Sequence, residues 1–228
     1  MEADKMLDYI KDVLENMPAD WLRLTTHRLD IYNEELAKVQ FLDQFEILAN
    51  QNKSSSSALS ELPTAYDYIR LGHPLSCVLE WAIAKLNNLA PDPVISFLSK
   101  TTPILSVLRK NLLNHKNTLI AYTNELPSSF DTEVLKTVYG YTFELRKVEK
   151  ASDVSEFDGS VIFVSHQDEI SPINQNSNID FYIHLYADFG SVLLVNGEQN
   201  KEYISDIQHV RRRETVAMTP NNCLAALK

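Results

Sequence analysis

Residues 93–144 constrain the fold most, because they contain two successive strand–loop–helix units. The apolar run Val94–Leu98 predicts a strand, and a hydroxyl-rich turn at 99–102 leads into apolar residues at helical spacing. Thr118–Thr123 predicts the next strand, and a turn and a helix over Asp131–Tyr139 follow it. Strands that alternate with helices in this way indicate a parallel sheet.

The remainder of the C-terminal half continues the alternation. The pattern predicts a strand at Val161–Val164, a helix over Phe181–Phe189, a strand at Ser191–Val195 and a last strand near Thr215–Met218. We therefore expect a Rossmann-like parallel sheet flanked by helices over residues 91–228.

The first 90 residues have a helical pattern instead. Met6, Ile10 and Val13 form an apolar stripe, and a long second helix follows Pro18. The sequence thus predicts an α/β protein with a helical domain over 1–90 and a Rossmann-like α/β domain over 91–228.

Composition narrows the class of protein. The 228 residues include 31 acidic and 21 basic residues, so the net charge of −10 argues against direct nucleic-acid binding through a global positive field. No apolar run reaches the length of about 18 residues that a membrane span needs. Cys77 and Cys223 provide neither a disulfide framework nor metal-ligand spacing. We expect a cytoplasmic protein without a metal site or membrane segment.

The loops that follow parallel strands form the ligand crevice of such a sheet, and candidate site residues lie there. Hydroxyl groups in these loops can donate hydrogen bonds to a sugar phosphate or a nucleotide. The candidate ligand-binding residues are Ser99, Thr101, Thr102 and Thr123. His166 and Asp168 follow the strand at 161–164 and are the candidate general acid and base.

Three short patterns occur in an order that resembles a known family. They are RLGHPLS at 70–76 with WAIAKL at 81–86, the unit Ile95–Leu108 with the turn Thr123–Pro127, and VAMTP at 216–220. The family contains the regulatory subunits (alpha, beta and delta) of translation initiation factor 2B, methylthioribose-1-phosphate isomerase and ribose-1,5-bisphosphate isomerase.

The resemblance implies a noncatalytic role. The isomerases of this family use a cysteine, an aspartate and a phosphate-binding arginine, whereas the matching positions here are Ser99, Gln167 and Leu126. The regulatory branch therefore fits better, which implies a homo- or hetero-oligomer without a cofactor, with translation-factor subunits as partners. The implied interface lies on the helix expected at 181–189 and comprises Phe181, Tyr182, Leu185 and Tyr186. The alternatives are a divergent sugar-phosphate isomerase with Asp168 as its base and a stand-alone binding module.

A second resemblance points to a different class. The order of six residues is similar to that in pyridoxal-phosphate enzymes of the cystathionine-synthase type: Tyr68, Arg70, Gly72, Pro74, Leu79 and Glu80. Those enzymes need a lysine that binds the cofactor covalently. Lys201 lies in an acidic, turn-like segment and Lys228 is the last residue, so the sequence disfavours this alternative.

Overall fold

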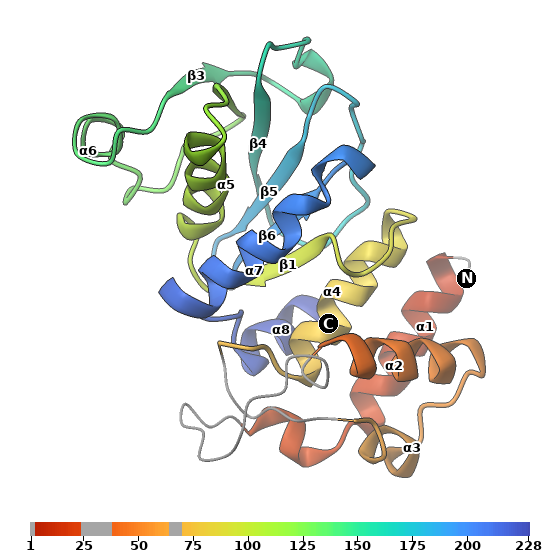
Figure 1. Cartoon of the computed structure of the whole chain (residues 1–228). Coiled ribbons are helices and arrows are strands. Elements are labelled where there is room, and N and C mark those ends of the chain that lie inside the picture. The colour runs from red at the N-terminus through yellow and green to blue at the C-terminus, as the bar shows by residue number, and fades with distance from the viewer. Residues whose placement is uncertain (1–2, 24–37, 64–69) are drawn as a thin grey trace. The chain divides into compact units, whose positions relative to one another are not determined.

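The chain folds into two compact units (Figure 1). The computed structural model describes residues 3–23, 38–63 and 70–228. Unit 1 comprises 1–91, 170–172 and 216–228, and unit 2 comprises 92–169 and 173–215. The C-terminal residues 216–228 thus group with the helices, whereas the expected domain bounds placed them with the sheet.

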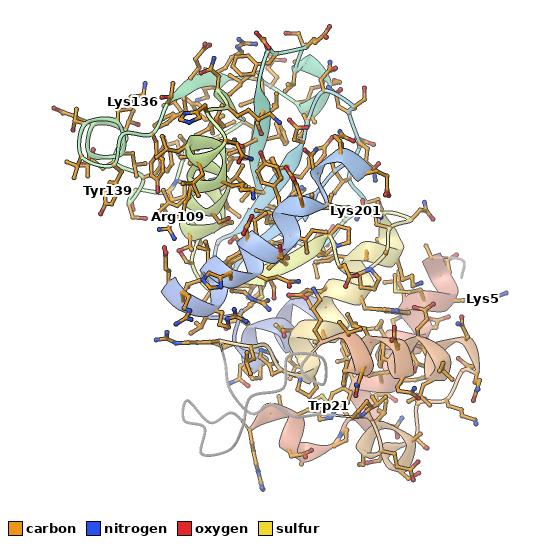
Figure 2. All side chains as sticks on the ribbon, viewed as in Figure 1. Lys5, Trp21, Arg109, Lys136, Tyr139 and Lys201 are labelled. Carbon is orange, nitrogen blue, oxygen red and sulfur yellow. The ribbon has the colours of Figure 1, made fainter. Side chains whose placement is uncertain are left out.

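Unit 1 is helical. Its elements are α1 (Ala3–Asn16), η1 (Ala19–Leu22), α2 (Gln40–Asn50), α3 (Ser56–Ser60), α4 (Pro74–Leu86) and α8 (Pro220–Leu227). The long second helix expected after Pro18 falls partly outside the described residues, and its described ends are η1 and α2. Aromatic rings form the core between these helices. Phe45 packs edge-on against Trp81, with ring centroids 5.2 Å apart, and Trp21 (Figure 2) packs against Phe41 at 5.8 Å.

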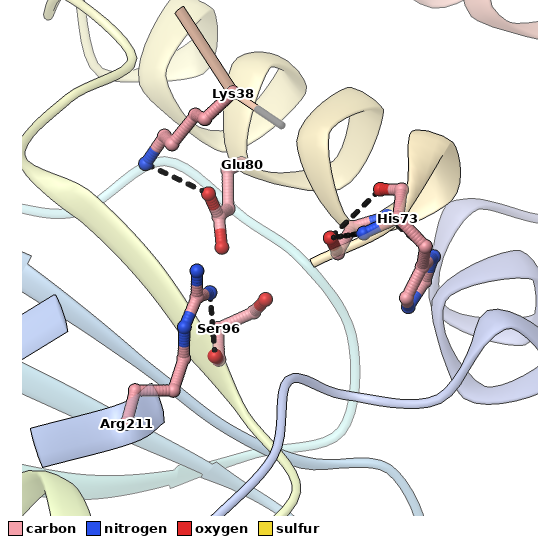
Figure 3. Close-up of polar contacts among 6 residues, drawn as sticks. Lys38, His73, Glu80, Ser96 and Arg211 are labelled. Atoms are coloured by element: carbon pink, nitrogen blue, oxygen red, sulfur yellow. Dashed lines mark hydrogen bonds and ion pairs between the residues drawn. The ribbon is translucent and has the colours of Figure 1, made fainter. Parts of the chain in front are cut away.

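A buried histidine fixes the start of α4 (Figure 3). The Nδ1 atom of His73 accepts a hydrogen bond from the backbone N–H of Ser76, 3.2 Å away, and the Ser76 hydroxyl closes a capping box. Nδ1 is therefore unprotonated, so Nε2 donates to the backbone oxygen of Met218 at 2.6 Å. In the same unit, the Lys38 ammonium pairs with the buried Glu80 carboxylate at 2.9 Å.

Unit 2 contains a six-stranded sheet in the order β1-β6-β5-β4-β2-β3. The strands are β1 (Val94–Phe97), β2 (Thr118–Tyr122), β3 (Phe143–Lys147), β4 (Ser160–Gln167), β5 (Phe181–Tyr186) and β6 (Gly190–Val195). The pairs β2–β3, β2–β4 and β4–β5 are parallel, whereas β6 is antiparallel to both β5 and β1. The sheet is therefore mixed, with β6 running against the other strands, and the expectation of an all-parallel sheet is wrong.

The helix predicted over 181–189 is also wrong, because this segment forms strand β5 in the interior of the sheet. The four residues expected to form an assembly surface lie inside unit 2: Phe181, Tyr182, Leu185 and Tyr186 are at most 5% exposed. Phe181 packs against Tyr203 with the two rings tilted, whereas Tyr182 contacts Phe163 on the next strand. These side chains stabilise the sheet and do not form the exposed patch that an interface needs.

Three helices of unit 2 contribute to one hydrophobic core on the sheet: α5 (Thr102–Leu113), α6 (Thr132–Thr137) and α7 (Glu202–Glu214). Two short 3₁₀ turns, η3 (Ala151–Asp153) and η4 (Glu198–Asn200), complete the unit. The sequence did not predict α7, and the last strand expected near 215–218 is wrong, since no regular element forms there. The buried Arg211 guanidinium of α7 donates to the backbone oxygen of Ser96 in β1 (Figure 3). Among the helices in the described ranges, none is long and apolar enough to cross a membrane.

Candidate ligand site at the strand ends

The candidate site lies where the parallel strands of unit 2 end. Because β1, β2, β4 and β5 run in the same direction, the residues that end or follow them lie at the same edge of the sheet. We call residues 98–102, 123–129, 166–169 and 187–190 the strand-end edge. It includes all six of the ligand-binding and acid–base candidates that the sequence predicted.

The Ser99 hydroxyl is the centre of the first loop. Its oxygen accepts hydrogen bonds from the backbone N–H groups of Thr101 and Thr102, at 3.3 and 3.0 Å. The Thr102 hydroxyl also donates to it, at 2.8 Å. The Ser191 hydroxyl, at the start of β6, donates to the Ser99 backbone oxygen at 2.6 Å and fixes the turn. Ser99 therefore supplies the side-chain acceptor for the start of α5, which the N-cap residue Thr101 does not provide.

The loop after β2 contacts the loop after β1. The hydroxyls of Thr101 and Ser129 share a hydrogen bond, so the loop after β1 and the loop after β2 touch. The Thr123 hydroxyl donates to the side-chain oxygen of its neighbour Asn124. The structure thus brings Thr101 into contact with the loop that begins at Thr123, and it satisfies these hydroxyls within the chain.

His166 and Asp168 both lie at the solvent-exposed end of β4. The Nε2–H group of His166 donates a hydrogen bond to the backbone oxygen of Glu125, 2.8 Å away. In the neutral ring, Nδ1 is then the acceptor nitrogen. An exposed imidazole with an oriented ring and a carboxylate two residues away can receive and hold a proton. The pair can also bind a small cationic group.

Lys100 is the residue at this edge that sequence reasoning missed. Its ammonium donates to the backbone oxygen of Ala187, just beyond β5, at 2.6 Å. A lysine within a hydroxyl-rich turn that precedes a helix was the available signal. An ammonium has three N–H donors, and the Ala187 bond uses one of them. Lys100 thus adds a positive charge to an edge that also carries Glu125 and Asp168.

Gly190 lets β6 start close against the end of β1. Its φ of +126° is unfavourable for other residues, and an added Cβ would lie only 2.2 Å from the backbone oxygen of Phe97. The close approach lets the Ser191 hydroxyl bond to the Ser99 backbone. The glycine therefore maintains the geometry of the first loop.

Unit 1 contains a pocket outside the strand-end edge. A pocket of about 560 Å³ in unit 1 is lined by Lys5 (Figure 2), Asp8, Tyr9, Asp12, Ala49, Asn50 and Asn52. The Tyr9 hydroxyl there already donates to the Lys53 backbone oxygen, and Asp8 pairs with Lys11. Across the described ranges, no group of three or more His, Cys, Asp or Glu residues is arranged to hold a metal ion.

Two solved structures that share the fold are a cystathionine gamma-lyase and a cystathionine gamma synthase. The cystathionine gamma-lyase from yeast aligns with a TM-score of 0.57 at 12% identity, over 100% of this chain and 62% of that one. The cystathionine gamma synthase from Xanthomonas oryzae pv. oryzae, in complex with cystathionine, aligns with a TM-score of 0.54 at 13% identity and with the same coverage. No protein-family model and no curated protein matches the chain. The chain thus shares a fold with these enzymes and spans about three fifths of their length.

These comparisons correct the first resemblance drawn from the sequence. The structures that share the fold are not initiation factor 2B subunits or their relatives, so the predicted family and the noncatalytic regulatory role in translation initiation are wrong. The isomerase alternative depended on the same resemblance and is withdrawn with it. The fold agrees instead with the second resemblance, which the sequence disfavoured for want of a suitable lysine.

Proposed function

We propose that this chain binds a sulfur-containing amino acid at the strand-end edge of unit 2. The fold supports the proposal, because two neighbours with TM-scores above 0.5 are named for cystathionine. The complete reaction of those enzymes belongs to chains of greater length. The proposal for this chain is therefore recognition of the amino acid.

The observation that carries the proposal is that a cation and a carboxylate lie at one edge of the sheet. Gln167 of β4 is opposite Tyr186 of β5, so Asp168 and Ala187 follow at the ends of neighbouring strands, which lie about 4.8 Å apart. The Lys100 ammonium lies on the Ala187 oxygen. A cation and a carboxylate are thus placed above neighbouring strands. An amino acid carries the complementary pair on one carbon.

We assign the ligand groups accordingly. The two remaining N–H donors of Lys100 bind the α-carboxylate, since a charged donor and a charged acceptor form the stronger class of hydrogen bond. Asp168 accepts from the α-ammonium, and the acceptor nitrogen of His166 binds or removes a proton from it. The hydroxyls of Thr101 and Thr123 border the site.

Calorimetry and thermal unfolding test the proposal. We expect cystathionine and methionine to bind saturably and to raise the unfolding temperature, because a ligand that binds only the folded state stabilises it by about 2.7 kcal/mol at 100 times Kd. Norleucine replaces the methionine sulfur with a methylene and is the matched ligand. We expect it to bind more weakly.

Variants locate the binding. Lys100→Met and Asp168→Asn are each expected to weaken binding by about tenfold or more, the effect of losing a charged hydrogen bond. Lys201→Met is the matched control, because Lys201 pairs with Glu198 and follows β6 at the opposite edge of the sheet. No heat and no thermal shift with any of the three amino acids would refute the proposal.

Self-association of the α/β unit stays a separate prediction. A solution mass above the 26.0 kDa of one chain would support self-association. Because the side chains of β5 are buried, another surface would have to form the contact.

A further inference from the structure

The start of α5 is the place where this fold would be expected to receive a phosphate. A helix N-terminus that follows a parallel strand presents free backbone N–H groups and the positive end of the helix dipole to an anion. The pyridoxal-phosphate enzymes of the cystathionine-synthase type carry a phosphate on their cofactor. The residues at this edge therefore show whether the chain suits that cofactor.

The backbone N–H groups at the start of α5 are already bonded within the chain. Those of Thr101 and Thr102 donate to the Ser99 hydroxyl, and those of Ile104 and Leu105 donate to the Thr101 backbone oxygen at 3.0 and 3.2 Å. The residue between them is Pro103, which has no N–H. The Ser99 oxygen thus occupies the position that an anion would take.

Two lysines of unit 2 that follow sheet strands, Lys201 and Lys100, do not suit the cofactor either. Lys201 forms an ion pair with Glu198 at 2.6 Å and follows β6, whose last residue Val195 is opposite the first residue of β5. It therefore lies at the edge remote from the strand ends. Lys100 lies in the loop after β1, at the strand-end edge. Its ammonium, however, donates to the backbone oxygen of Ala187, just beyond β5. The start of α5 and these two lysines therefore do not fit pyridoxal phosphate.

We infer that the strand-end edge of unit 2 takes unphosphorylated ligands, because Ser99 fills the anion position at the start of α5. The inference extends the proposed function by naming the class of ligand excluded. The exclusion of phosphate follows from the hydrogen bonds of the Ser99 hydroxyl and does not depend on which amino acid the edge binds.

5-Deoxypyridoxal and pyridoxal phosphate are matched probes for the wild-type chain, because both keep a free aldehyde and only the second carries a phosphate. Each is titrated, treated with borohydride to fix it to any lysine that holds it, and mapped by mass spectrometry. We expect the two probes to label equally, spread over exposed lysines, and we expect inorganic phosphate to give no thermal shift. Labelling by pyridoxal phosphate at one lysine, at a tenfold lower concentration than 5-deoxypyridoxal, would overturn the inference.

A variant tests the role of Ser99 itself. Ser99→Ala removes the acceptor and frees the N–H groups of Thr101 and Thr102, so it should gain a saturable thermal shift with inorganic phosphate. Ser191→Ala is the control, since it loses a hydrogen bond in the same turn but keeps the Ser99 hydroxyl. A folded Ser99→Ala chain with no gain over Ser191→Ala would contradict the role of Ser99. If circular dichroism shows that Ser99→Ala is unfolded, the comparison of the two probes on the wild-type chain decides the inference.

These tests use ligands different from those of the proposed function. A chain that binds methionine but shows no preference for the phosphorylated probe agrees with both. A chain that prefers pyridoxal phosphate and ignores amino acids contradicts both.

Discussion

Thr102 donates both its backbone N–H and its hydroxyl to the Ser99 hydroxyl oxygen, at 3.0 and 2.8 Å. One serine thereby satisfies the start of α5 and fixes the loop between β1 and that helix. Lys100 belongs to the same loop, and its ammonium donates to the backbone oxygen of Ala187, just beyond β5. The loop therefore has an ordered conformation before any ligand arrives.

Gly190→Ala should destabilise the chain far more than Gly140→Ala. The new Cβ at 190 would lie 2.2 Å from the Phe97 backbone oxygen, whereas nothing lies within 4 Å of one at 140. Both positions have positive φ, which costs about 1–2 kcal/mol for a non-glycine residue. Urea unfolding should show about that cost for Gly140→Ala and at least about 2 kcal/mol more for Gly190→Ala. Equal losses would contradict the close approach of β6 to β1.

Tyr203→Phe should lower the free energy of unfolding by about 1–3 kcal/mol, because it leaves a buried acceptor without its donor. The Tyr203 hydroxyl donates to the side-chain oxygen of Asn111 at 2.6 Å, and the Asn111 amide donates to the Thr118 hydroxyl at 2.8 Å. Tyr139→Phe is the control, since Tyr139 (Figure 2) is 59% exposed. Urea unfolding measures both, and a neutral Tyr203→Phe would contradict the network.

His184 should make stability depend on pH. Burial lowers the pKa of this 8% exposed imidazole on β5 to about 4, from 6.5 when exposed. Between those values the unfolded chain binds the proton and the folded chain does not, so the free energy of unfolding falls as the pH drops from about 6.5 to about 4. The full loss from this residue is about 3 kcal/mol.

Variants isolate that contribution. His184→Leu should flatten the pH dependence between 4 and 6.5, measured by urea unfolding at several pH values. His115→Asn should leave it unchanged, because His115 is exposed and its φ of +53° suits asparagine. An unchanged slope in His184→Leu would show that this histidine is not the titrating group.

Glu46 should stabilise unit 1 as an anion. Burial acts to raise the pKa of its carboxyl, but hydrogen bonds from the Lys85 ammonium, at 2.8 Å, and from the Trp81 indole together hold the pKa below its usual value. The folded carboxylate is favoured, so its contribution is present above the unfolded pKa and is lost as the pH falls through the folded one. Glu46→Gln should lose it at pH 7 and leave acid stability almost unchanged. Unfolding curves at pH 7 and pH 3 separate these outcomes.

The sequence predicted the first half of unit 2 well because turns separate its elements clearly. The hydroxyl turn and Pro103 mark the start of α5, and the observed β1, β2 and α6 lie within the predicted segments. The segment 181–189 was wrongly predicted as a helix because most of its residues are apolar. A strand buried on both faces then has no period that distinguishes it from a helix.

Helix α7 was missed for the opposite reason. Its surface is highly charged, but Tyr203, Ile207 and Val210 recur at helical spacing and are buried. The sequence placed its six candidate residues after strands, but it did not show how their hydroxyls bond. Hydrogen bonds such as that from Ser191 to Ser99 join residues 92 positions apart, and no local pattern encodes them.

The most direct test of the account is a map of where methionine or cystathionine binds, from backbone amide NMR shifts of the ¹⁵N-labelled chain. We expect saturable shifts at the amides of Lys100, Asp168 and Asp188, with unit 1 unaffected. Shifts confined to unit 1, or no shifts at saturating ligand, would contradict the proposed amino acid site at the strand-end edge.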